Sequence, residues 1–104
     1  NVAGRNVVLV DDLITTGSTL CGAAELLKQR GAGSVRAVVT HALITPKGIA
    51  ALKASPIEEI IVTDTVPVRD WLGFPVTVLT VAELLGEAIL RIHNNQSVTS
   101  LFQV

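Results

Sequence analysis

Short apolar runs alternate along the chain with segments in which apolar residues recur at helical spacing. Residues 7–10 form a continuous run of valine and leucine, a pattern typical of a strand that is buried on both faces of a parallel sheet. Similar runs predict three more strands, at residues 35–39, 60–62 and 76–79. The chain is therefore expected to build one sheet of four short strands.

Three helices are predicted between and after these strands. Apolar residues at helical spacing predict the first helix over residues 20–27, and Gly31 supplies its stop. Pro46 is well placed to open a short second helix. The third and clearest helix covers residues 81–92, which are apolar on one face and charged on the other. Strands that alternate with helices favour an α/β fold with three layers and a mostly parallel sheet.

Composition narrows the range of functions. The 104 residues are 49% hydrophobic and 16% charged, which indicates one folded domain rather than a disordered chain. Eight Lys and Arg against nine Asp and Glu give a net charge of -1, and aromatic residues make up 3%, so no nucleic-acid partner is expected. No apolar run approaches the roughly 20 residues of a membrane span. Cys21 is the only cysteine, which favours a reducing cytoplasm and a partly buried helical position.

Polar residues follow the predicted strands at their carboxyl ends, where parallel sheets bind ligands. These residues are Asp11-Asp12, Thr40-His41 and Thr63-Asp64-Thr65. Because the carboxyl ends of parallel strands meet at one edge of the sheet, we expect these groups to lie near a common site.

The segment after the first strand carries the chemistry. Two adjacent carboxylates, Asp11 and Asp12, can accept hydrogen bonds from the hydroxyls of a sugar or hold a hard cation such as magnesium. Strand neighbours point to opposite faces, so one acid can face the site while the other braces the loop. A run of small residues follows, namely Thr15, Thr16, Gly17, Ser18 and Thr19. Their backbone amides can surround an anion at the start of a helix, and the segment as a whole predicts a sugar-phosphate site.

A simpler interpretation of the same segment is a structural one. Thr16 or Ser18 would then only cap the helix, and the two aspartates would form a solvated turn. The segment lacks the lysine of the G-x-x-x-x-G-K-[ST] loop, so a nucleotide site of that type is not predicted.

Residues 8–19 resemble the phosphoribosyl-pyrophosphate-binding signature of type I phosphoribosyltransferases. Other segments resemble the C-terminal part of the ribose-phosphate pyrophosphokinase family, namely residues 39–41, 62–67, 84–94 and 97–102. The resemblance covers essentially the whole chain in the right order. It implies a type I phosphoribosyltransferase-like fold, of which residues 1–104 are the C-terminal domain or part of it.

The resemblance implies that ATP and ribose 5-phosphate react, with magnesium, to give phosphoribosyl pyrophosphate and AMP. By position, Asp11 and Asp12 would bind the ribose hydroxyls and the magnesium environment, and residues 15–19 would hold the 5-phosphate. Many family members have Asp where this chain has Thr15 and a small residue, often Gly, at Ser18, so the role of Thr15 is open.

The C-terminal tail also resembles a functional segment of the family. Ser97, Thr99 and Phe102 match positions that help to form a phosphate and ADP regulatory site between subunits in regulated members. Thr99 is usually Ser there, a change that keeps the hydroxyl. A homo-oligomer is therefore expected.

Family members are much longer than this chain. The segments absent here include those that bind ATP, so we expect the 104 residues to be a piece of a longer two-domain enzyme that is not active alone. Two related functions stay open: a non-catalytic regulatory subunit associated with the synthetase, and a salvage phosphoribosyltransferase. A response-regulator domain is disfavoured, because no lysine ends the last strand.

Other polar and aromatic residues have mostly structural interpretations. His41 is expected to be a hydrogen-bonded structural histidine, and His93 is expected to lie at a helix end. Asp64 is either a site contact or a turn residue. Trp71 and Phe74 are expected to fill the edge of the core.

Overall fold

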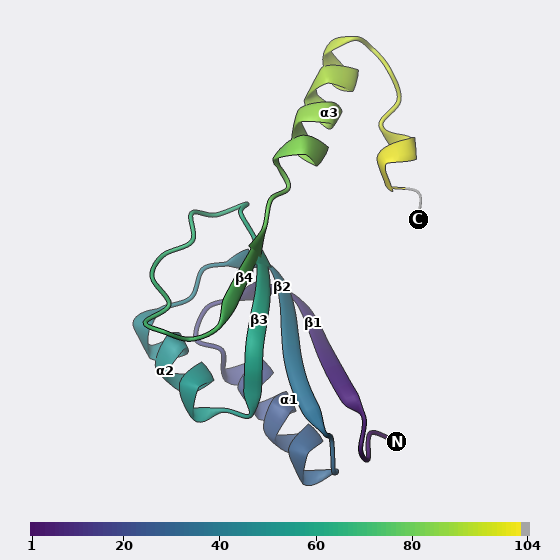
Figure 1. Cartoon of the computed structure of the whole chain (residues 1–104). Helices are drawn as coiled ribbons and strands as arrows, with labels where there is room; N and C mark the ends of the chain where they lie inside the picture. The colour runs from purple at the N-terminus through teal and green to yellow at the C-terminus, as the bar shows by residue number, and fades with distance from the viewer. Residues whose placement is uncertain (103–104) are drawn as a thin grey trace.

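The computed structural model describes residues 1–102 and contains an all-parallel sheet (Figure 1). In chain order the elements are β1 (Asn6–Ile14), α1 (Ser18–Gln29), β2 (Ser34–Ala42), α2 (Pro46–Ala54), β3 (Ile57–Thr63), β4 (Val76–Leu79), α3 (Ala82–His93) and a 3-10 turn (Thr99–Phe102). The strands lie in the order β1-β2-β3-β4, and each neighbouring pair is parallel. The predicted α/β class and parallel sheet are confirmed.

Local sequence signals explain where the first two helices begin and end. Gly17, with φ of 73°, precedes α1, and Gly31, with φ of 91°, follows it; both backbones are left-handed, a conformation that glycine adopts without steric cost. The side chain of Thr45 caps α2 by accepting a 3.0 Å hydrogen bond from the Gly48 amide, and Pro46 occupies the first turn.

The hydrophobic core lies between the sheet and the pair α1 and α2. Both helices cover the same face of the sheet, as Figure 1 shows, which is the expected result of right-handed crossovers from β1 to β2 and from β2 to β3. The largest fully buried side chains are Val35, Val39, Leu52, Ile60 and Val62. Strand residues that alternate with these face the other side of the sheet.

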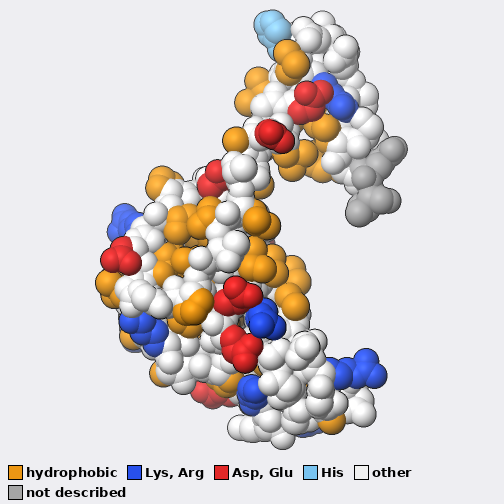
Figure 2. Space-filling view, in the orientation of Figure 1, with side chains coloured by type: hydrophobic (Ala, Val, Ile, Leu, Met, Phe, Trp, Pro, Cys, Tyr) orange, Lys and Arg blue, Asp and Glu red, His pale blue; other side chains and the backbone are white. Residues whose placement is uncertain are grey.

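That other side is open in the described chain, which corrects the sequence prediction. Val8 and Val10 are 54% and 78% exposed, so residues 7–10 are not buried on both faces. The predicted third layer is absent among residues 1–102, because β3 joins β4 through a connection without a helix and α3 projects away from the sheet (Figure 1). None of the residues of α3 is buried, and hydrophobic side chains gather along it as well as over the sheet body (Figure 2).

The first strand is also longer than predicted. β1 continues through Asp11 and Asp12, and Asp11 pairs in register with Val39 of β2. The two carboxylates therefore stand on a strand rather than beyond its end. Within the part of the chain that the structure describes, no helix is long and apolar enough to cross a membrane.

Candidate functional site

A pocket of about 140 Å³ lies at the carboxyl end of β1, where the chain turns into α1. We call it the loop pocket; it is lined by Asp11, Leu13, Ile14, Thr15, Thr16, Gly17, Ser18, Thr19 and Leu20. Every residue predicted to bind the sugar phosphate lines this pocket, except Asp12. Their role in binding stays a prediction, whereas their common location is a structural finding.

The start of α1 leaves its first amides available to the pocket. Gly17 is the residue that precedes the helix, and no side chain caps it. The first bond of the helical pattern runs from the Cys21 amide to the Gly17 carbonyl, at 2.9 Å. The amides of residues 18–20 precede that bond, and such groups favour an anion. The structural interpretation of Thr16 or Ser18 as the cap of this helix is therefore wrong, because no side chain caps it. The Thr16 hydroxyl instead donates a hydrogen bond to Ser18 Oγ at 3.3 Å.

The two aspartates lie differently in the structure. Asp11 lines the loop pocket, and its Oδ1 accepts a 2.8 Å hydrogen bond from the backbone amide of Asp12. Asp12 is the next residue of an extended strand, so its side chain points to the opposite, open face of the sheet. The structure thus brings one carboxylate, not two, to the pocket.

The donor set allows a shared magnesium ion but not a metal site made by protein groups alone. Among residues 1–102, no group of three or more His, Cys, Asp or Glu side chains could hold a metal ion. Magnesium commonly keeps several waters and takes one or two carboxylates together with substrate oxygens. Asp11 fits the part of a single carboxylate ligand in such a shell.

Positive charge at the loop pocket comes from the backbone. No Lys or Arg lines it. The helix dipole contributes roughly 0.3–1 kcal/mol to anion binding, so several amide hydrogen bonds must supply most of the affinity. An anion in this pocket would therefore be held mainly by backbone amides.

The N-terminus of α2 lies directly behind the loop. The Thr45 amide donates a 3.0 Å hydrogen bond to the Thr15 carbonyl, and the Leu43 amide donates one of the same length to the Ile14 carbonyl. The sequence prediction missed Thr45. Its signal was present, because a threonine just before a proline that opens a helix is a typical capping residue.

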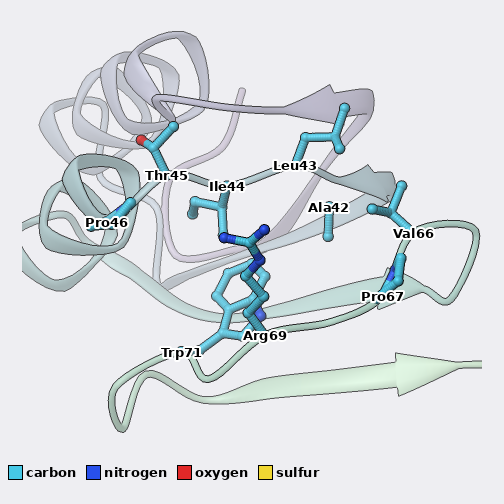
Figure 3. A pocket seen from close by; sticks show the side chains of 9 residues that line it. All are labelled: Ala42, Leu43, Ile44, Thr45, Pro46, Val66, Pro67, Arg69 and Trp71. Atoms are coloured by element: carbon cyan, nitrogen blue, oxygen red, sulfur yellow. The ribbon is translucent and has the colours of Figure 1, made fainter.

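A second pocket, of about 250 Å³, lies at the carboxyl ends of β2 and β3 and was not predicted. It is lined by Ala42, Leu43, Ile44, Thr45, Pro46, Val66, Pro67, Arg69 and Trp71, and Figure 3 shows Arg69 and Trp71 rising from the β3–β4 connection towards Ile44. Trp71 and Phe74 are buried with ring centroids 6.5 Å apart, which confirms that they fill the edge of the core. Thr45 belongs to the wall of this pocket and also contacts the loop.

The remaining residues at the strand ends make structural hydrogen bonds. His41 Nδ1 lies 2.7 Å from Thr65 Oγ1, as expected of a structural histidine. The carboxylate of Asp64 accepts a 2.9 Å hydrogen bond from the Val81 amide, and this bond is the main reason that the pKa of Asp64 is lowered. Asp64 therefore braces the entry to α3, and it does not line either pocket.

Two of the three tail residues predicted to be regulatory, Ser97 and Thr99, are in contact. Ser97 Oγ donates to Thr99 Oγ1 at 3.1 Å, while Arg91 reaches back from α3 to the Ser97 carbonyl. Phe102 is 66% exposed. His93 lies in the last turn of α3, as predicted. A regulatory role for the tail stays a prediction.

Comparisons with known proteins agree with the resemblance. A family described as the phosphoribosyl synthetase-associated domain matches residues 1–103. A ribose-phosphate pyrophosphokinase of Synechococcus elongatus is 49% identical over 99% of this chain and 32% of its own length, and one of Buchnera aphidicola is 46% identical over 99% and 33%. The crystal structure of phosphoribosylpyrophosphate synthetase from Mycobacterium smegmatis matches 90% of this chain and 32% of that chain, with 37% identity and a TM-score of 0.84. The chain thus spans about a third of the length of these relatives.

Proposed function

We propose, given that this chain belongs to the phosphoribosyl synthetase-associated family, that it forms the ribose 5-phosphate-binding part of an enzyme that makes phosphoribosyl pyrophosphate. The reaction transfers pyrophosphate from ATP to ribose 5-phosphate and releases AMP. One observation carries the binding role: Asp11 and the small residues 15–19 line the same pocket at the end of β1.

Different groups in this pocket would bind different parts of ribose 5-phosphate. The amides at the start of α1 would bind the 5-phosphate, where the helix dipole favours negative charge. The carboxylate of Asp11 would accept hydrogen bonds from the ribose hydroxyls. Holding the sugar at both ends would fix the anomeric hydroxyl, which attacks the β-phosphorus of ATP as AMP leaves. Catalysis of this kind depends mainly on positioning and on neutralising charge.

In this proposal magnesium would be bound jointly by this chain and by substrate oxygens. When bound, the ion would neutralise phosphate charge. In this chain Asp11 would supply one oxygen ligand to the magnesium ion. Asp12 lies on the open face of the sheet, so its carboxylate would stay outside the pocket.

The remaining components would come from outside the loop pocket. Its lining holds no cationic side chain, so groups outside this pocket would bind the triphosphate of ATP. A cytoplasmic location and a homo-oligomer, with Ser97, Thr99 and Phe102 at a regulatory site between subunits, belong to the same proposal. The exposure of Phe102 is compatible with a contact to another subunit.

The binding role is tested by titrating ribose 5-phosphate, with and without magnesium, into the isotopically labelled chain. We expect saturable amide shifts centred on residues 11–20. Asp11→Asn should weaken binding at least tenfold, since hydrogen bonds to a charged group contribute roughly 1.5–3 kcal/mol. Asp70→Asn, a matched change in an exposed turn distant in sequence, should bind like the unsubstituted chain. A folded spectrum with no response at the loop would contradict the binding role.

The catalytic role is tested separately, in the native protein that carries these residues. AMP formation from ATP should require ribose 5-phosphate and magnesium. Binding without AMP formation would favour the non-catalytic regulatory subunit. Consumption of phosphoribosyl pyrophosphate with a nucleobase would instead favour a salvage transferase.

A further inference from the structure

We infer that Thr45 is a positioning residue for the loop pocket, which it supports from behind without lining it. This inference rests on the proposed function, because it concerns how the same loop presents its amides to an anion. The residue lies at the junction between β2 and α2, 30 positions from the loop residue that it contacts.

Thr45 holds the Thr15 carbonyl with two groups. Its backbone amide donates a hydrogen bond of 3.0 Å to that carbonyl, and its hydroxyl donates a longer one of 3.4 Å. The same hydroxyl oxygen accepts a 3.0 Å hydrogen bond from the Gly48 amide. One hydroxyl therefore links the first turn of α2 to the first residue of the loop, using both its donor and an acceptor position.

The direction of the Thr15 carbonyl decides the direction of the next amide. A trans peptide is planar, so the carbonyl of Thr15 and the amide of Thr16 point to opposite sides. Because the carbonyl points to Thr45, the Thr16 amide points away from α2. Thr16 lines the loop pocket, and its amide is not engaged in a backbone hydrogen bond among the described loop and turn residues. Thr45 thus leaves this amide available to a bound anion.

The loop and the first turn of α2 are packed closely, with no room for a side chain between them. A Cβ placed on Gly48 would come within 2.4 Å of the Thr15 carbonyl oxygen, so the backbones of the loop and of α2 are already in close approach. The Leu43 amide adds a neighbouring hydrogen bond to the Ile14 carbonyl. The loop is held along one side by α2 and by the residues that lead into α2. Thr45 supplies the side-chain hydrogen bond in that contact.

The experiment compares loss of the Thr45 hydroxyl with its conservative replacement and with loss of a hydroxyl at the entry to another helix. Thr45→Val removes the hydroxyl at almost constant shape, and Thr45→Ser keeps it. Thr80→Val is the matched control, because Thr80 Oγ1 accepts from the Ala82 amide at the entry to α3, away from the loop. Thr45→Ala also removes the hydroxyl and serves as the second variant if Thr45→Val does not fold. Affinity for ribose 5-phosphate and amide spectra without ligand are measured for each in the native protein.

We expect Thr45→Val to weaken ribose 5-phosphate binding about tenfold, the effect of losing roughly one hydrogen bond's contribution, with Thr45→Ser and Thr80→Val within twofold of the unsubstituted protein. Equal affinity of folded Thr45→Val, or of Thr45→Ala in its place, would overturn the inference. If the unsubstituted protein does not bind ribose 5-phosphate, the proposed function fails on its own. The positioning role is then decided by the ligand-free spectra: amide shifts at residues 15–19 in Thr45→Val but not in Thr45→Ser support it, and unchanged shifts overturn it.

Discussion

The carboxylate of Asp64 accepts a 2.9 Å hydrogen bond from the backbone amide of Val81, 17 residues further along the chain. Asp64 follows β3, and Val81 is the residue just before α3. This contact links the end of a central strand to the helix that leaves the sheet. Because α3 buries none of its residues within the described chain, its direction depends on contacts at its entry such as this one.

The Asp64–Val81 contact should depend on pH in acid. Hydrogen bonding to Val81, and next to Thr80, lowers the pKa of Asp64 below its usual value of 3.8. A lowered pKa means that the contribution to stability is present above the usual pKa and is lost as pH falls through the lowered value. The protection factor of the Val81 amide, which is the factor by which its exchange is slower than in an unstructured chain at the same pH, should therefore fall below about pH 4. Asp64→Asn keeps an acceptor oxygen and should remove this pH dependence; a dependence that persists would contradict the assignment.

Gly17→Ala should weaken both the fold and ligand binding. A left-handed backbone costs a non-glycine residue about 1 kcal/mol, and the new Cβ would meet only ordinary contacts at 3.7 Å. Gly4→Ala is a matched control, since Gly4 has φ of 70° and open space around it. Chemical denaturation should show a similar loss for both variants, whereas calorimetry should show weaker ribose 5-phosphate binding for Gly17→Ala alone. Equal affinities would show that the shape of the loop does not depend on this glycine.

Substitutions on the two faces of the sheet should differ in cost. Val35 is fully buried under the helices, so Val35→Ala should lower the free energy of unfolding by about 2 kcal/mol, through lost burial and a cavity. Val10→Ala, on the open face, should change it by no more than about 0.5 kcal/mol in this chain. Urea denaturation measures both. An equal loss for Val10→Ala would contradict an open face at this strand.

Cys21 should react slowly in the folded protein. The side chain is buried, and desolvation raises the pKa of its thiol despite a hydrogen bond with Ser55 that lowers it. Alkylation requires the thiolate and access to it, so iodoacetamide should label the folded chain at about pH 8 far more slowly than the chain in denaturant. Ser55→Ala removes the group that lowers the pKa and should not accelerate labelling. Rapid labelling of the folded chain would contradict a buried, structural thiol.

Periodicity and turn chemistry predicted most of the elements. The strand over residues 76–79 matches β4, and the helix over residues 81–92 differs from α3 by one residue at each end. Gly31 and Pro46 act as the stop and start that their residue types indicate, because such conformational preferences are local.

Features that depend on contacts between distant segments could not be predicted from the sequence. The pairing of β1 with β2 extends β1 past Asp11 and Asp12, where the polar side chains had suggested that it ended. A run of valines indicates burial but does not show which residues cover it. In the described chain only one face of β1 is covered, and Val8 lies on the other face. The link between Thr45 and Thr15 joins residues 30 positions apart and has no signature of its own in either segment.

The sequence by itself determined the α/β class, the order of the elements, the family and the segment of residues 11–19 as the place to look for sugar-phosphate chemistry. These follow from local preferences and from a motif, both of which are written in consecutive residues. The tertiary structure decided that Asp11 rather than Asp12 lines the pocket, that α1 and α2 share one face of the sheet, and that α2 supports the loop. Each of these depends on strand register and crossover direction, which bring distant residues together only when the chain has folded.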